Sequence, residues 1–170
     1  MLEVIKNRRA CRAFKDQPVE DEKIEEIIDA GLLAPSGMNR QTSVIIAIKD
    51  KKTRDQLMEL NRSIMGRDGD PFYGAPVILM VIAHKEGLSM HDGAATIENM
   101  LLETTNQGLA SCWIHRAEEE IRSEEGKKIL AFTGLNYDDY VGIGHVIIGY
   151  PKDGYVPNPK VIKENRKFIK

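Results

Sequence analysis

Four apolar runs of strand length constrain this chain more than any other feature of its sequence. They cover residues 43–49, 77–83, 110–114 and 140–150. The segments IIAI, VILMVI and VIIG within them show no alternation of polar and apolar side chains, which is typical of strands buried on both faces. Such strands need helices on both sides of their sheet to exclude water. The pattern therefore predicts an α+β fold in which helices cover a central sheet.

The segments between these runs carry apolar residues at helical spacing. After a short amphipathic start at 2–8, helices are predicted from an Asp21 N-cap to about residue 33, over about 51–64, and from an Asp92 N-cap over 93–107, ending at Gly108. A charged helix with Ile121, Ile129 and Leu130 follows the third run. Residues 65–74 hold several glycines and a proline, so we expect an exposed, mobile loop there.

Length and charge limit the class of protein. The 170 residues, 42% of them hydrophobic, suit one domain over 1–170 and exclude intrinsic disorder. The 24 basic and 26 acidic residues give a net charge of −2, which lacks the basic excess of nucleic-acid-binding proteins. The first ten residues, MLEVIKNRRA, contain no apolar signal core, and no apolar run approaches the length of a membrane span. We therefore expect a cytoplasmic protein with no nucleic-acid or membrane partner.

Cysteine, histidine and tryptophan residues give weaker signals. Cys11 and Cys112 could form a redox pair, but packing is the better interpretation for Cys112, which lies in an apolar run. His145 also lies in an apolar run, and we expect a hydrogen-bonded core histidine rather than a base. Trp113 could stack on a ring, but we expect it to fill the core. The four histidines lack metal-ligand spacing, so no metal site is predicted: His84, His91, His115 and His145.

Three further polar segments stand out. Arg8, Arg9 and Arg12 place three permanently charged, planar groups close together, either as a solvated basic turn or as a site for phosphate and an electron-rich ring edge. Residues 34–41 (APSGMNRQ) are either an ordinary helix-to-strand loop or a recognition loop whose amides bind a heterocycle. The acidic run 118–120 is expected to be the solvated first turn of a helix.

Four blocks of this sequence resemble the nitroreductase family. Residues 8–14 (RRACRAF) are similar to its Arg-Arg-Ser-x-Arg-x-Phe pattern, and 34–41 to its Ala-Pro-Ser-x-x-Asn-x-Gln loop. Residues 92–114 resemble its central helix and following strand, and 142–151 its last core strand. The blocks match in order and spacing over essentially the whole chain. The resemblance implies a three-layer sandwich with a mixed or antiparallel sheet, in a domain-exchanged homodimer whose tail, about 151–170, lies on the partner.

The same resemblance implies two FMN sites at the subunit interface. Arg8 and Arg12, helped by Arg9, would face the flavin from one subunit, where a positive group supports charge at the N1–C2=O edge and another neutralises phosphate. The loop 35–39 would come from the other subunit. The implied cofactor-binding residues are Arg8, Arg9, Ala10, Arg12, Pro35, Ser36, Gly37, Asn39, Gln41, Ile114, His115, Arg116, Lys160 and Lys163.

Their roles differ along the chain. Asn39 would bond the ring edge, and the backbone of 114–116 would lie near flavin N5. Lys160 or Lys163 would complete the phosphate site, and the stretch 163–166 would wrap onto the partner. Two positions depart from the family pattern, because Ala10 replaces a serine and Thr42 follows Gln41 in place of Pro-Trp. The first removes one hydroxyl hydrogen bond to the flavin, and the second changes the wall near the active site.

The implied activity is that of an FMN-dependent oxidoreductase. NADH or NADPH would donate a hydride to flavin N5, and a nitroaromatic, quinone or flavin-type acceptor would then take its place in a ping-pong mechanism. The protein would supply no catalytic base or nucleophile, and Arg12 would give electrostatic support. The alternative is an FMN-binding storage or sensing protein with little turnover. A third reading, dehalogenation or flavin fragmentation, is disfavoured by the short 65–76 segment.

Overall fold

The sheet has four strands in the order β1-β2-β4-β3, and every neighbouring pair is antiparallel. The computed structural model describes residues 1–163 and 167. The strands are β1 (Ser43–Ile48), β2 (Val77–His84), β3 (Ala110–Ile114) and β4 (Tyr140–Gly149). Each coincides with one of the predicted apolar runs. The register of β4 against β2 shifts between Val81 and Ile82, where Gly144 and Gly142 are the partners, so Ile143 forms a bulge.

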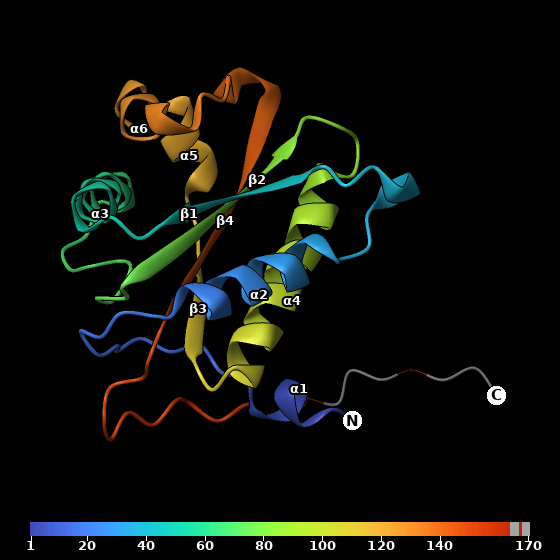
Figure 1. Ribbon diagram of the computed structural model, residues 1–170, viewed down its shortest axis with the longest axis vertical. Helices are drawn as coiled ribbons and strands as arrows, with labels where there is room; N and C mark the ends of the chain where they lie inside the picture. The colour runs from blue at the N-terminus through green and yellow to red at the C-terminus, as the bar shows by residue number, and fades with distance from the viewer. Residues whose placement is uncertain (164–166, 168–170) are drawn as a thin grey trace.

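Helices cover both faces of the sheet, which gives three layers (Figure 1). Two of the longer ones, α2 and α4, pack on one face, and α3, α5 and α6 lie on the other. The bounds of the helices are α1 Glu3–Asn7, α2 Asp21–Leu32, α3 Lys51–Met65, α4 Ser89–Asn106, α5 Ala117–Arg122 and α6 Glu124–Ile129, with short 3₁₀ turns η1 Gly37–Asn39, η2 Ala131–Thr133 and η3 Tyr137–Asp139.

The core is divided in two by the sheet. On one side Phe72, Leu57 and Ile121 pack against alternate residues of β2, and on the other Ile27 and Met100 pack against the remaining ones. All residues of β2 from Val77 to Ala83 are buried, as are those of β4 from Gly142 to Gly149. The prediction of strands covered on both faces is therefore confirmed for β2 and β4. It is wrong for β1, an edge strand in which Ala47 is exposed.

Two helix boundaries differ from the predicted ones. Asp21 is the first residue of α2, and Glu20 holds the N-cap position without a side-chain cap. Asp92 lies inside α4, which begins three residues earlier at Ser89. Its carboxylate instead accepts hydrogen bonds from outside the helix, so a tertiary contact explains this residue. Gly108 follows the helix with φ of 72°, as a C-terminal glycine should.

The charged helix after β3 is broken into α5 and α6. Ser123 ends α5 in an extended conformation, and its hydroxyl accepts a hydrogen bond from the Gly126 N–H to begin α6. A second N-cap within the segment therefore divides what the sequence suggested was one helix.

The 65–74 segment is an exposed loop over residues 66–69, as predicted, but its second half is anchored. Phe72 is fully buried in the core. The Asp70 carboxylate accepts hydrogen bonds from the backbone N–H groups of Phe72 and Gly74, and it also pairs with Arg54 of α3. One buried aromatic ring and one carboxylate thus fix a segment whose composition suggested a mobile loop.

The first part of the C-terminal tail lies on its own chain. The Lys152 N–H donates to the Ala13 carbonyl, and the Tyr155 hydroxyl lies between the Ala10 carbonyl and the Arg12 N–H. Beyond it, Val156 and Val161 are exposed. Of the predicted partner-wrapping stretch 163–166, residues 164–166 lie outside the described part of the chain. Residues Lys152 and Tyr155 therefore contact their own chain, and the contact of the 151–170 tail with a partner stays a prediction.

Candidate functional site

A cavity of about 480 Å³ lies where β3 ends and α5 begins. Its floor comes from the end of β3, its rim from the first turn of α5, and one wall from α4. The lining residues are Met90, Ala94, Trp113, His115, Arg116, Ala117, Glu118, Glu119, Gly142 and Ile143. Two of the predicted site residues, His115 and Arg116, are among them, whereas Ile114 is buried beneath. A mixed lining of aromatic, aliphatic and charged groups suits a small organic ligand.

Trp113 corrects one prediction. It is 37% exposed and lines the cavity, so it does not fill the core. The Gly144 backbone passes against its indole, because a Cβ atom on Gly144 would lie 2.4 Å from Trp113 Nε1. The ring of His115 lies 6.4 Å from that of Trp113, measured between centroids. The cavity floor therefore offers an aromatic surface to a planar ligand.

The arginine segment runs beside β3 and α4. Ala10 forms a parallel bridge with Ser111, and the Cys11 N–H donates to the Ser111 carbonyl. Arg8 Nε lies 4.0 Å from the Glu98 carboxylate of α4, and Arg12 is exposed. Arg9 differs, since its guanidinium folds back onto the carbonyls of Lys6 and Arg8. The structure thus leaves the guanidinium of Arg12 open to solvent and that of Arg8 only weakly paired.

The 35–41 loop is held by Asp92. Oδ1 of this carboxylate accepts the Gly37 N–H at 3.0 Å, and Oδ2 accepts the Thr42 hydroxyl at 3.3 Å. The Ser36 hydroxyl accepts the Gln41 N–H at 2.9 Å. These contacts hold three non-glycine residues in the left-handed region, a conformation that L residues seldom adopt. They are Met38, Asn39 and Gln41, with φ between 52° and 55°.

These contacts fix the loop in one conformation, in which the side-chain amides of Asn39 and Gln41 face solvent. Asn39 and Gln41 are both exposed, and the Gln41 amide donates to the Asn39 carbonyl oxygen at 3.3 Å. A smaller cavity of about 150 Å³ separates this loop from α4.

The arginine segment and the 35–41 loop contact different faces of α4. Met90, Ala94 and Glu98 are spaced by four residues and share one face, which lines the cavity and meets Arg8. Asp92 lies about 200° around the helix from Met90 and binds the loop. In Figure 1, α1 lies beside the lower end of α4, whereas the segment joining α2 to β1 lies beyond its upper end. One chain therefore does not bring these two groups of predicted site residues together.

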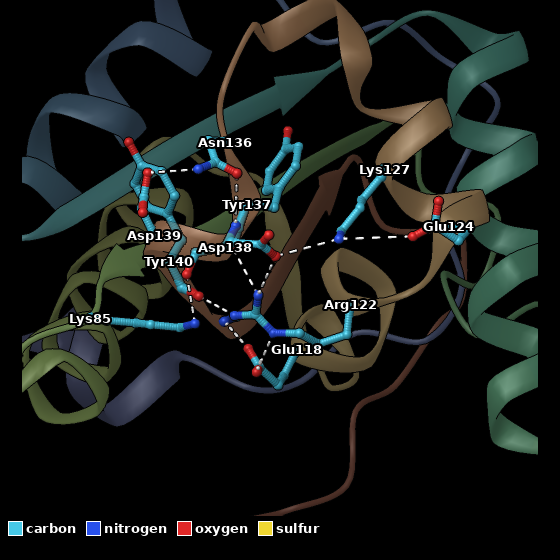
Figure 2. Close-up of polar contacts among 11 residues, drawn as sticks. Lys85, Glu118, Arg122, Glu124, Lys127, Asn136, Tyr137, Asp138, Asp139 and Tyr140 are labelled. Atoms are coloured by element: carbon cyan, nitrogen blue, oxygen red, sulfur yellow. Dashed lines mark hydrogen bonds and ion pairs between the residues drawn. The ribbon is translucent and has the colours of Figure 1, made fainter.

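A polar network fixes the first turn of α5 (Figure 2). Arg122 donates to the Glu118 carboxylate and, from its other nitrogens, to the carbonyls of Tyr137 and Tyr140. Glu118 in turn accepts the Gly142 N–H at 2.6 Å. Burial alone would raise the pKa of Glu118, but the bonds from Arg122 and Gly142 outweigh it and hold that pKa below its ordinary value. The carboxylate is therefore ionised at neutral pH, beside the cavity.

Glu120 corrects the expectation of a solvated acidic turn. It is fully buried, and its carboxylate binds His145 Nε2 at 2.8 Å and Asn61 Nδ2 at 2.5 Å. His145 is a core histidine as predicted, but its Nδ1 atom has no partner among the described residues. Sequence reasoning missed Asn61. It shares the inner face of α3 with Leu57, so a polar residue four positions after a core leucine was the available signal.

The two cysteines are free and buried. Cys112 is 4% exposed, in agreement with the packing interpretation, and Cys11 is 3% exposed. Burial raises the pKa of both thiols, so both are poor nucleophiles in the folded protein.

Lys160 and Lys163 are exposed. A hollow of about 1060 Å³ lies along the outer side of α3 near α6, and none of the predicted site residues lines it. Within residues 1–163 and 167, no group of three or more acidic, histidine or cysteine side chains could hold a metal ion. Over the same residues, no helix has the length and apolarity that crossing a bilayer requires.

The fold and sequence both have counterparts among known proteins. A nitroreductase of Bacteroides fragilis, crystallised with bound FMN, superposes with a TM-score of 0.89 at 26% identity, covering 98% of this chain and 96% of that one. An Archaeoglobus fulgidus protein provisionally named NADH dehydrogenase/NAD(P)H nitroreductase is 28% identical over 156 residues, which is 89% of this chain and 86% of the relative. The FMN reductase [NAD(P)H] of Bacillus subtilis is 29% identical, covering 96% and 72%.

These likenesses place the protein in the class of α+β proteins with a nitroreductase fold. The model of the nitroreductase family matches residues 5–71, which include both the arginine segment and the 35–41 loop. In sequence and in fold, the chain is similar to proteins of the nitroreductase family.

Proposed function

We propose that this protein is an FMN-dependent oxidoreductase that uses NADH or NADPH as electron donor. The observation that carries the proposal is an arginine segment that meets α4 at Glu98, one helical turn from the cavity-lining Ala94, in a chain whose relatives are named nitroreductase and FMN reductase. The acceptor would be a small molecule of the nitroaromatic, quinone or flavin type.

The residues present fit FMN. The exposed guanidinium of Arg12 and the weakly paired one of Arg8 suit a phosphate and the electron-rich edge of a ring. The exposed amides of Asn39 and Gln41 can both donate and accept hydrogen bonds, as the N–H and C=O edge of a flavin requires. The aromatic floor at Trp113 suits a planar ring system. Two glutamates, Glu118 and Glu119, line the cavity, and Arg122 pairs with the Glu118 carboxylate.

When bound, FMN would supply the redox chemistry, taking a hydride at N5 from the donor and passing electrons to the acceptor in a ping-pong sequence. The protein's part is to bind, orient and support charge. Arg12 would stabilise negative charge at the N1–C2=O edge, while Arg8, with Lys160 or Lys163, would hold the phosphate. The His115–Arg116 backbone would form the wall near N5.

We further propose that the working form is a homodimer with two composite sites. The 35–41 loop and the arginine segment lie on different sides of α4, so each site would take its arginines from one subunit and Asn39 from the other. Such an interface would bury exposed apolar side chains that lie beside the loop and the cavity, namely Met38, Leu88 and Met90. The tail after Tyr155 would then contact the partner.

A visible absorption spectrum followed by anaerobic addition of NADH and then NADPH tests the proposed activity. A yellow protein that bleaches would support the oxidoreductase, and the faster donor would define its preference. A yellow protein that stays oxidised would favour the storage or sensing alternative. A colourless protein that cannot be loaded with FMN would contradict the proposal.

Subunit mixing tests the composite site. Arg12→Ala and Asn39→Ala homodimers should each be impaired at both sites. A heterodimer of the two would contain one site with both defects and one intact site, so random exchange should restore about a quarter of the parent's sites. No recovery in mixtures shown to exchange subunits, or a flavin-loaded monomer in analytical ultracentrifugation, would contradict the composite site.

A further inference from the structure

Three polar side chains from different elements meet in the core beneath the cavity. Asn61 comes from α3, Glu120 from α5 and His145 from β4, and each is 0% exposed. The Glu120 carboxylate binds Asn61 Nδ2 through one oxygen, at 2.5 Å, and His145 Nε2 through the other, at 2.8 Å. Since a carboxylate accepts, Nε2 carries the hydrogen of this bond. The edge of the Phe72 ring closes the group, 5.3 Å from the imidazole between centroids.

This cluster reaches the cavity through Asn61. The same Nδ2 group that binds Glu120 also donates to the main-chain carbonyl of His115 at 3.0 Å. The next residue, Arg116, has φ of 84°, a left-handed conformation that costs a non-glycine residue about 1 kcal/mol or more. Such a conformation persists only where its surroundings hold it. Asn61 thus binds the peptide at the point where the chain is strained and enters the cavity wall.

Stability does not account for this choice of residues. Replacing buried, hydrogen-bonded ionisable side chains by apolar ones of similar volume is often neutral or stabilising. Two atoms of the cluster, Asn61 Oδ1 and His145 Nδ1, are buried with no partner among the described residues, which adds a desolvation cost. The polar groups therefore have a reason to be present other than the free energy of unfolding.

We propose that Asn61, Glu120 and His145 form a buried positioning network that fixes the His115–Arg116 backbone at the cavity and thereby controls the rate of flavin reduction. Glu120 accepts hydrogen bonds from both other residues, and His145 orients its carboxylate from the sheet. Asn61, held by Glu120, donates to the His115 carbonyl and so fixes its position. The inference rests on the proposed function, because it assumes that this backbone lies beside the flavin. None of the three is proposed to touch the cofactor or the substrate.

The test compares Asn61→Leu and Glu120→Gln with Thr104→Val as a matched control. Thr104 is equally buried, and its hydroxyl donates to the Met100 carbonyl within α4, away from the cavity. Three quantities are measured for each protein: the thermal midpoint, the FMN dissociation constant, and the rate constant for anaerobic reduction by NADH or NADPH. Hydrogen–deuterium exchange of peptides covering residues 113–119 gives a readout independent of activity.

Both network variants should exchange faster at 113–119 than the parent does. Because a misplacement on the scale of 1 Å can cost on the order of 100-fold in rate, the reduction rate constant should fall about 10- to 100-fold. FMN affinity should change less than about threefold, since the proposed contacts to the phosphate and to the polar ring edge come from the arginine segment, Asn39 and the tail lysines. Thr104→Val should keep the parent's exchange and reduction rate, whatever its thermal midpoint.

Three other results would contradict the proposed positioning role of the network. Folded variants with parent-like exchange at 113–119, or faster exchange with a parent-like reduction rate, would overturn the positioning role. Loss of folding in both variants would show that the cluster maintains the core, which also overturns it. If the parent itself takes up no FMN or is not reduced, the proposed function fails separately, and the exchange data still show whether the network holds the backbone.

Discussion

Replacing Gly142 by alanine should separate β4 from the start of α5. A Cβ atom at this position would lie 2.2 Å from the Glu118 nitrogen, 2.3 Å from the Ala117 carbonyl carbon and 2.5 Å from the Glu118 Cα. All three are backbone atoms, so no side chain can move aside. An ordinary contact begins at 3.4 Å, so the two segments must separate by about 1.2 Å, the difference between 3.4 and 2.2 Å.

That separation would also stretch the bond from the Gly142 N–H to the Glu118 carboxylate, now 2.6 Å long. Overpacking of this kind costs roughly 2 kcal/mol, which for a chain of this size lowers the thermal midpoint by about 4–8 °C. Because α5 begins at the cavity wall, the flavin reduction rate should fall as well.

Thermal unfolding followed by circular dichroism measures the effect, with Gly87→Ala as the control. An alanine Cβ at Gly87 would meet no atom within 4 Å, so this variant should stay within about 0.5 kcal/mol of the parent. If Gly142→Ala and Gly87→Ala had equal thermal midpoints, the close approach of Gly142 to the start of α5 would not constrain the fold.

Three further predictions concern charge and thiol chemistry. Arg12→Ala should slow flavin reduction more than it changes the thermal midpoint, because this side chain is exposed and is proposed to support charge on the flavin; a parent-like reduction rate in flavin-loaded Arg12→Ala would contradict that role. The folded state lowers the pKa of Glu118, so its carboxylate stabilises the protein above about pH 4.3, and this contribution is lost as the pH falls through the lower folded-state pKa. The difference in thermal midpoint between the parent and Glu118→Gln should therefore be largest at neutral pH and shrink in acid; a constant difference would show that the charge is irrelevant. Cys11 and Cys112, whose pKa values burial raises, should react with a thiol reagent only slowly until urea unfolds the protein, and rapid labelling of either in the native state would contradict their burial.

The sequence predicted the positions of the strands more accurately than the ends of the helices and the state of the loops. The four apolar runs became the four strands because burying a continuous apolar segment of that length leaves few alternatives. The boundaries depended on tertiary contacts. Asp92 looked like a helix cap, yet its carboxylate binds the 35–41 loop, and Phe72 fixed a segment that its glycines had suggested was mobile.

The candidate site divides in the same way. Residues 8–14 and 34–41 could be selected from the sequence because each group is contiguous and chemically distinctive. The sequence could not show that these two segments contact different faces of α4, because that arrangement depends on how α2, α4 and β3 pack. Trp113 shows the same dependence, because whether a residue near a strand end fills the core or lines a cavity is decided by what covers it.

The sequence by itself therefore determined local features. These are the apolar runs that become strands, the helical spacing of apolar residues, and the segments rich in charged and amide side chains. What only the tertiary structure decided is which distant polar groups meet. Asn61, Glu120 and His145 are separated by 59 and 25 residues along the chain and carry no shared pattern. They form one cluster because the packing of α3 and α5 on β4 removes all three from water, where each polar group then needs a partner from another element.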